Sequence, residues 1–185
     1  MRKLLIICTL LSSLLSPCEA QQKIRDVFLQ MPDSLLPYLT SNNRLDFLDF
    51  MDSKMKAGVQ NSLGGKSEML TLTDDLLVLQ VSRSLHMEMR LFPVNEAVDS
   101  CQQVVCMITT YGNDAPESKI ALYTVKWNPI DASAHLSLPT EPYTAEFVET
   151  PSVGLSLRQA NLLDAIAHEE QKKTLPWLKF IEWKP

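Results

Sequence analysis

The sequence predicts a single α+β domain in which an antiparallel β-meander is packed by N-terminal helices and a C-terminal helix. Apolar residues recur with helical spacing up to about residue 56, and apolar and polar residues then alternate between residues 68 and 127. The gaps between the alternating segments are too short for the crossovers of about a dozen residues that parallel strands require. The strands are therefore expected to be antiparallel neighbours.

Two helices and a turn are predicted before the strands. Lys23–Met31 has helical apolar spacing and ends at Pro32, and the two prolines of Pro32–Leu39 predict a short turn on the core. Asn43 is the predicted cap of a second helix, Arg44–Lys56. One side of this helix is expected to be core and the other to be solvated, with Phe47, Leu48, Met51 and Met55 on the first and Asp46, Asp49 and Asp52 on the second.

Strict alternation marks the clearest strand of the meander. Four apolar side chains are expected on its buried face and three polar ones toward solvent, namely Leu85, Met87, Met89 and Leu91 against His86, Glu88 and Arg90. Turns are predicted at Asp74-Asp75 and Gly112–Pro116. The remaining strands of the meander are predicted at Glu68–Thr73, Leu76–Ser82, Gln102–Tyr111 and Lys119–Trp127.

The end of the chain mixes strand and helix patterns. Ala134–Leu138 and Tyr143–Glu149 are interpreted as short strands. Ser156 is the predicted cap of a helix, Leu157–Glu170, and Trp177–Trp183 is the predicted final strand.

Residues 1–20 have the pattern of an export signal, with two basic residues, an apolar stretch and small residues before Gln21. We expect cleavage after Ala20, one domain over residues 21–185, and a periplasmic or secreted location. The alternative is a lipoprotein anchored through Cys18, because the preceding residues roughly resemble a lipobox.

Cleavage at this point would leave two cysteines, Cys101 and Cys106. An oxidising compartment favours a disulfide, whereas five residues of extended strand span about 16 Å, too far for one. Both a disulfide and two unpaired thiols therefore remain open. The chain has no Cys-x-x-Cys motif, and no set of four ligands for zinc is evident.

The sequence contains no recognisable catalytic motif, and we expect no catalytic, cofactor-binding or metal-binding residue and no cofactor. The three histidines, His86, His135 and His168, lie far apart in the sequence. Gly64–Ser67 resembles only the end of a phosphate-binding loop, and no Gly-x-Ser-x-Gly motif occurs.

Charge and hydropathy exclude further classes of protein. The formal net charge is −5 and no run of basic residues occurs, so we expect no nucleic acid as a partner. Residues 21–185 contain no apolar run long enough to span a membrane.

Several stretches of the chain resemble a known family. They are Met31–Leu39, Asn42–Asp46, Leu63–Glu68, Leu72–Asp75 and Asp99–Val104. The family consists of exported proteins from Gram-negative gut anaerobes and is catalogued as a domain of unknown function. This resemblance implies export and one domain, and it implies no catalytic residue, cofactor or partner.

The most favoured function is that of a non-catalytic interaction or binding module of the cell envelope, whose partner is an envelope protein. A carrier that holds a small apolar ligand between sheet and helices is the first alternative, since Met87 and Met89 could line a pocket. A hydrolase with an unrecognised site is the second. A filled core with an exposed aromatic patch would favour the interaction module. A wholly apolar cavity would favour the carrier, and a pocket with convergent carboxylates would favour the hydrolase.

Overall fold

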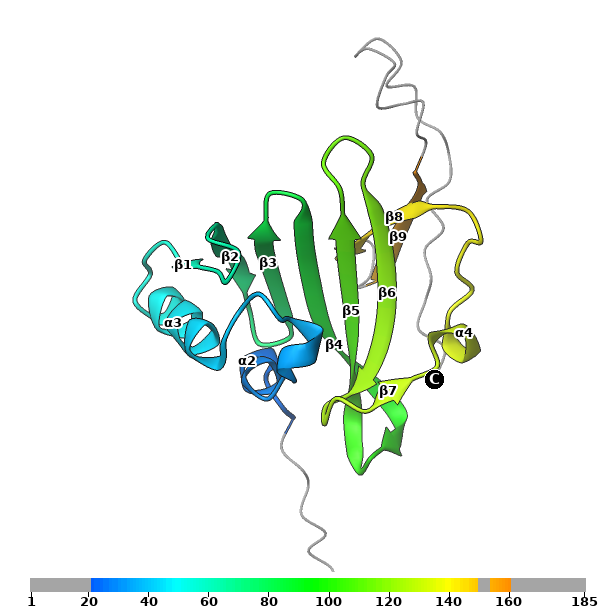
Figure 1. Cartoon of the computed structure of the whole chain (residues 1–185). Coiled ribbons are helices and arrows are strands. Elements are labelled where there is room, and N and C mark those ends of the chain that lie inside the picture. The colour runs from blue at the N-terminus through cyan, green and yellow to red at the C-terminus, as the bar shows by residue number, and fades with distance from the viewer. Residues whose placement is uncertain (1–20, 150–153, 161–185) are drawn as a thin grey trace, which may run out of the picture.

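A computed structural model describes residues 21–149 and 154–160 of the chain. Two short α-helices and a 3-10 turn precede a sheet of seven strands, and a further helical turn and a β-hairpin follow it (Figure 1). The helical elements are α2 (Ile24–Leu29), η2 (Asp33–Leu35), α3 (Ser41–Asp52) and α4 (Ala132–His135). The strands are β1 (Gly58–Gln60), β2 (Lys66–Leu72), β3 (Leu76–Ser82), β4 (Leu85–Val98), β5 (Cys101–Tyr111), β6 (Glu117–Thr124), β7 (Pro129–Ile130), β8 (Tyr143–Val148) and β9 (Gly154–Gln159).

The main sheet is the predicted antiparallel meander. Its strands lie in the order β1 to β7, and each pairs with its neighbours in the chain. A two-residue turn joins β4 to β5, and its residues Asp99 and Ser100 both have positive φ, as a type I′ turn requires. Gly112 begins the turn after β5, where a Cβ atom would lie 2.8 Å from the Ala115 carbonyl oxygen. The predicted α+β class is confirmed.

The N-terminal helices cover one face of this sheet (Figure 1). Their apolar residues form one core with the sheet, in which Phe28 and Phe47 are fully buried. The indole Nε1 of Trp127 donates to the Val27 carbonyl at 2.9 Å, which ties α2 to the end of the meander. The predicted core residues Met87 and Met89 belong to this cluster and are 2% and 0% exposed.

A second layer, the β8–β9 hairpin, lies against the opposite face of the sheet (Figure 1). Phe92, Cys106 and Ile120 of the sheet form a separate apolar cluster with Ala145 and residues of β9. The backbone N–H of Ala145 donates to the Ser118 hydroxyl at 2.9 Å. The main sheet is therefore covered by helices on one side and partly by strands on the other.

This second layer corrects the predicted exposure of the polar face of β4. Arg90 is only 4% exposed, and His86 and Glu88 are half-buried rather than directed into solvent. The alternation itself is correct, because the four apolar residues of the strand lie in the core on the helical side. The error arises because β8, which begins more than fifty residues later in the chain, covers the other side.

Two boundaries of the second helix differ from the prediction. α3 begins at Ser41, with Thr40 as its cap, and Asn43 is the third residue of a capping box with Thr40. The helix ends at Asp52, so Met55 lies beyond it and is 58% exposed. Phe47 and Leu48 are buried and the three aspartates are exposed, as predicted.

Two predictions after β7 are wrong. Residues 132–135 form a helical turn begun by Asp131, which accepts from the Ser133 backbone N–H, instead of the predicted strand Ala134–Leu138. Ser156 and Leu157 belong to β9 rather than to the start of a helix, because they pair with β8. The predicted strand Tyr143–Glu149 agrees with β8. The remainder of the predicted C-terminal helix and the strand Trp177–Trp183 lie outside the described residues.

Cys101 and Cys106 are not joined by a disulfide. Cys101 lies in the core on the helical side and Cys106 in the core under the hairpin, so their side chains lie on opposite faces of the sheet. Burial raises the pKa of the Cys106 thiol to about 12. This thiol is therefore protonated and unreactive at neutral pH.

Candidate functional site

Charged side chains connect the main sheet to the second layer. The Arg90 guanidinium contacts the carboxylate of Asp75 at 2.8 Å and that of Glu149 at 3.5 Å, which brings together the turn after β2 and the end of β8. Its Nη1 atom is buried and has no hydrogen-bond partner within the described ranges. Both carboxylates lie near solvent. Because Asp75 belongs to a turn of the main sheet and Glu149 follows β8, the two ion pairs of Arg90 link the layers.

Glu88 makes a second link of the same kind. One of its oxygens accepts from the backbone N–H of Phe147 in β8 at 3.1 Å, and the other lies 3.2 Å from Nε2 of His86. Nδ1 of His86 lies 3.3 Å from the side-chain oxygen of Gln80. Glu88 thus contacts β8 directly and His86 contacts Glu88, and neither residue lines the pocket on the hairpin.

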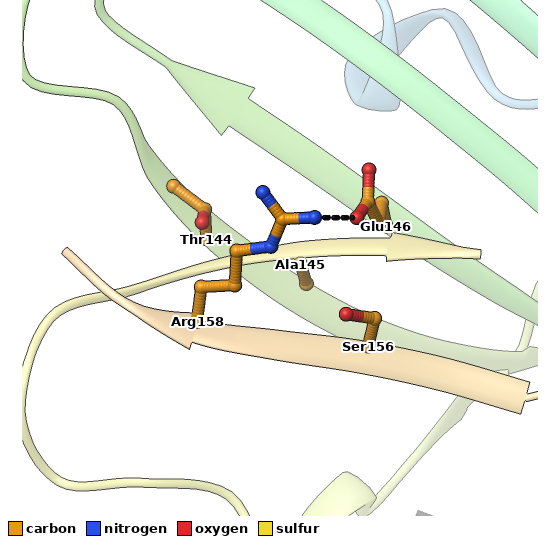
Figure 2. A pocket seen from close by; sticks show the side chains of 5 residues that line it. All are labelled: Thr144, Ala145, Glu146, Ser156 and Arg158. Atoms are coloured by element: carbon orange, nitrogen blue, oxygen red, sulfur yellow. Dashed lines mark hydrogen bonds and ion pairs between the residues drawn. The ribbon is translucent and has the colours of Figure 1, made fainter. Parts of the chain in front are cut away.

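A small pocket lies on the β8–β9 hairpin itself and is lined by Thr144, Ala145, Glu146, Ser156 and Arg158 (Figure 2). Thr144 is paired with Arg158 and Glu146 with Ser156 in the strand register. These four residues are therefore adjacent and share one face of the hairpin. The Arg158 side chain reaches across β8 to Glu146, with 2.9 Å between Nη2 and Oε1 (Figure 2).

Ser156 is the unusual member of this pocket. It is 1% exposed, and its Oγ has no hydrogen-bond partner in the described part of the chain. A buried hydroxyl without a partner costs about 1–3 kcal/mol, so this atom has an unmet requirement that a bound group could satisfy. Arg158 and Glu146 are partly exposed beside it.

The pocket is not arranged for covalent catalysis. A serine nucleophile needs a base within hydrogen-bond reach, and Ser156 Oγ has no such neighbour among the residues described. The pocket volume of about 70 Å³ is well below the roughly 300–1,000 Å³ of small-molecule sites. This arrangement can bind a small polar group by hydrogen bonds.

None of the four polar residues was recognised from the sequence, in which no site residue was expected. Ser156 was interpreted as a helix cap. A signal was nevertheless present, since Leu155 and Leu157 alternate with Ser156 and Arg158, which is the pattern of a strand with one buried face.

The other residues considered for chemistry lie apart. No group of three or more histidine, cysteine or acidic side chains suited to a metal occurs among the described residues. His135 lies in the last turn of α4, on the chain segment that leads to β8, and His168 is outside the described residues. Asp52 pairs with Arg25 of α2, with 2.7 Å between Oδ2 and Nη2.

The stretches that carried the family resemblance have structural roles. Asn61 is buried, and its side chain accepts from the backbone N–H groups of Leu63 and Gly65 and donates to the hydroxyl of Ser67. These bonds close the turn between β1 and β2, so Gly64–Ser67 belongs to a strand–turn–strand unit and not to a phosphate loop.

The other stretches fasten the N-terminal segment. The Gln103 side chain accepts from the backbone N–H of Gln22 at 2.7 Å and donates to its carbonyl at 3.2 Å. Arg44 of α3 donates to Asp33 of η2 at 2.7 Å. These contacts explain the fold and assign no chemistry.

The fold and the pocket together define an α+β domain with a covered meander sheet, two apolar cores and a small polar surface pocket. The chain belongs to the family described as protein of unknown function (DUF3256), whose model matches residues 18–174. No curated protein matches the sequence significantly.

Among solved structures, that of a domain of an uncharacterized protein from Porphyromonas gingivalis W83 is similar in fold. It has 22% sequence identity and a TM-score of 0.64, and the match covers 83% of this chain and 87% of that one. At this identity the similarity shows the fold alone.

Proposed function

We propose that this protein is a non-catalytic binding module of the cell envelope that recognises a partner protein through the outer face of the β8–β9 hairpin. The observation that carries the proposal is the pocket on that face, with the buried Ser156 hydroxyl, which has no hydrogen-bond partner among the described residues, beside Arg158. A polar pocket of this size suits one group of a larger partner.

The two alternative functions receive less support. A carrier needs an apolar cavity, but Met87 and Met89 are packed within the core on the helical side. A hydrolase needs an activated nucleophile or convergent carboxylates. Among its described lining residues the pocket has one carboxylate, Glu146, which is paired with Arg158. Among the described helices, none has the length and apolar composition needed to span a membrane.

Export is part of the proposal and rests on the signal-like residues 1–20, with a mature domain over residues 21–185. The intact mass of the protein recovered from the cell envelope or medium tests it. A mature N-terminus at Gln21 is expected. Lipid on Cys18 would replace this with a membrane-anchored form, and an uncleaved cytoplasmic chain would refute export.

Binding is tested by site-specific crosslinking in the cells that produce the protein. A photoreactive residue at Thr144, on the pocket rim, should give one discrete crosslinked protein. The same residue at Leu45, which is exposed on α3 on the other side of the sheet, is the matched control. Equal crosslinking from both positions, or none from Thr144, would contradict the proposal.

Mass spectrometry of the purified chain under native conditions separates the carrier from the binding module. The binding module is expected to show the mass of the polypeptide alone. A co-purifying apolar molecule released by organic solvent would instead favour the carrier.

A further inference from the structure

We infer that the pocket on the β8–β9 hairpin binds a primary carboxamide, the side-chain group of asparagine or glutamine, presented by the partner protein. This inference rests on the proposed function and names the chemistry recognised at the same face.

The pocket contains both hydrogen-bond donors and hydrogen-bond acceptors. Ser156 Oγ is buried without a partner, and Arg158 uses one of its five N–H groups on Glu146 within the described ranges. Glu146 contributes a second carboxylate oxygen, Oε2, for which the described residues provide no donor. The pocket therefore offers donors from Ser156 and Arg158 and an acceptor from Glu146.

The charges of the pocket select a neutral ligand. Arg158 and Glu146 form an ion pair, so the four polar side chains carry no net charge. A ligand carboxylate would be attracted by Arg158 but repelled by Glu146. A ligand ammonium would be attracted by Glu146 but repelled by Arg158. A carboxamide is neutral, accepts through its oxygen and donates through its nitrogen, and so can use both kinds of group at once.

Size restricts the ligand further. A volume of about 70 Å³ exceeds the roughly 10–15 Å³ needed by one water molecule. It leaves room for a planar group of a few atoms and not for a sugar ring or a nucleobase. Because the pocket lies on the surface of a hairpin, the remainder of the partner can extend away from it.

The inference is tested with propionamide, titrated into the full chain labelled with ¹⁵N while backbone amide signals are followed by NMR. Saturable shifts confined to residues 144–146 and 156–158 are expected, with a dissociation constant on the order of millimolar for so small a ligand. Propionate, propylammonium and glucose are titrated in parallel and should shift these signals at least about fivefold less at equal concentration.

Ser156→Ala removes the unpartnered hydroxyl and should weaken propionamide binding about fivefold, the usual effect of one lost hydrogen bond. Ser53→Ala removes a hydroxyl from the exposed end of α3 on the other side of the sheet and should leave binding unchanged. Preserved amide spectra outside the hairpin show that each variant is folded.

Stronger shifts with propionate, propylammonium or glucose would overturn the carboxamide assignment, as would binding that Ser156→Ala does not change. Crosslinking from Thr144 in cells distinguishes a failure of the carboxamide inference from a failure of the proposed partner-binding function. If the crosslink persists while propionamide does not bind, the partner-binding function stands and the carboxamide chemistry is wrong. If both fail, the proposed function fails with it.

Discussion

At the scale of single residues, Arg90 shows how a charge is retained inside this fold. Its guanidinium is buried between the sheet and the hairpin, while its partners Asp75 and Glu149 remain close to solvent. If the arginine is removed, water can hydrate both carboxylates. The substitution should therefore lower the free energy of unfolding less than breaking a fully buried ion pair would.

We expect Arg90→Ala to lower the free energy of unfolding by about 1.5–3 kcal/mol, through the loss of charge-assisted hydrogen bonds and side-chain packing. Lys56→Ala breaks the exposed pair with Glu68 and should cost less than about 1 kcal/mol. Urea unfolding of both variants measures the difference. Equal costs would show that Arg90 does not hold the two layers together.

Asp99 is one of three aspartates, with Asp52 and Asp131, whose lowered pKa should affect stability at acid pH. Hydrogen bonds from Asn128 and, to a smaller extent, Thr124 lower the pKa of its carboxyl group. A group whose pKa is lower in the folded state stabilises that state above its ordinary pKa, and this stabilisation is lost as the pH falls through the folded-state value. Stability should therefore decline below about pH 4.

Asp99→Asn keeps a residue that tolerates the positive φ of this turn and removes the titration. We expect the free energy of unfolding of this variant to fall less steeply than that of the original protein between about pH 5 and pH 2. Asn128→Ala removes the principal donor and should flatten the dependence in the same direction. Unchanged slopes in both variants would exclude Asp99 as a source of the acid sensitivity.

At the scale of elements, α3 illustrates how far periodicity predicts burial. Phe47 is fully buried and Asp49 is exposed, in agreement with the amphipathic pattern. Leu45 is nevertheless exposed, and Arg44 is buried and pairs with Asp33 of η2. The pattern predicted the side facing the sheet and not the contact with a neighbouring turn.

Phe47→Ala should lower the free energy of unfolding by about 3–5 kcal/mol because it leaves a cavity in the core. Asp49→Ala, two residues further along the same helix, should change it by no more than about 0.5 kcal/mol. Denaturant titrations of both variants provide the comparison. A large cost for Asp49→Ala would reveal a partner that its exposure does not suggest.

The position of the β8–β9 hairpin, by contrast, depends on side chains of the main sheet and not on its own sequence pattern. Two backbone N–H groups of β8 donate to side chains of the main sheet, Ala145 to Ser118 and Phe147 to Glu88. These side-chain acceptors bind N–H groups on the open edge of β8, which would otherwise need the acceptors of another strand. Residues of β4 and β6, two strands apart in the meander, thus determine where the hairpin lies.

At the scale of the whole molecule, the burial of two core methionines makes methionine oxidation a measure of global opening. Met87 and Met89 are 2% and 0% exposed, whereas Met55 is 58% exposed after the end of α3. An oxidant reaches the first two only when the sheet separates from its helices.

Under native conditions with hydrogen peroxide, Met55 should form its sulfoxide readily, and Met87 and Met89 at least about tenfold more slowly. Peptide mapping by mass spectrometry measures all three in one sample, with Met55 as the internal control. Comparable rates at the three positions would disprove the packed core and restore the apolar carrier as a candidate.

The sequence by itself determined which side chains share a face. Strict alternation placed Met87 and Met89 together, and the short turns required antiparallel neighbours, because these features depend on local backbone geometry. Local pattern does not say whether the second face of a strand meets water. That was decided by β8 and the residue after it, which contact Glu88 and Arg90 from a distant part of the chain.

The tertiary structure also decided the conformation of β9 and the existence of the pocket. Ser156 and Leu157 occur in a segment with both strand and helix patterns, and pairing with β8 selected the strand. Only that pairing brings Ser156 and Arg158 beside Thr144 and Glu146. The site is a property of strand register between separate segments, which no single stretch of the sequence contains.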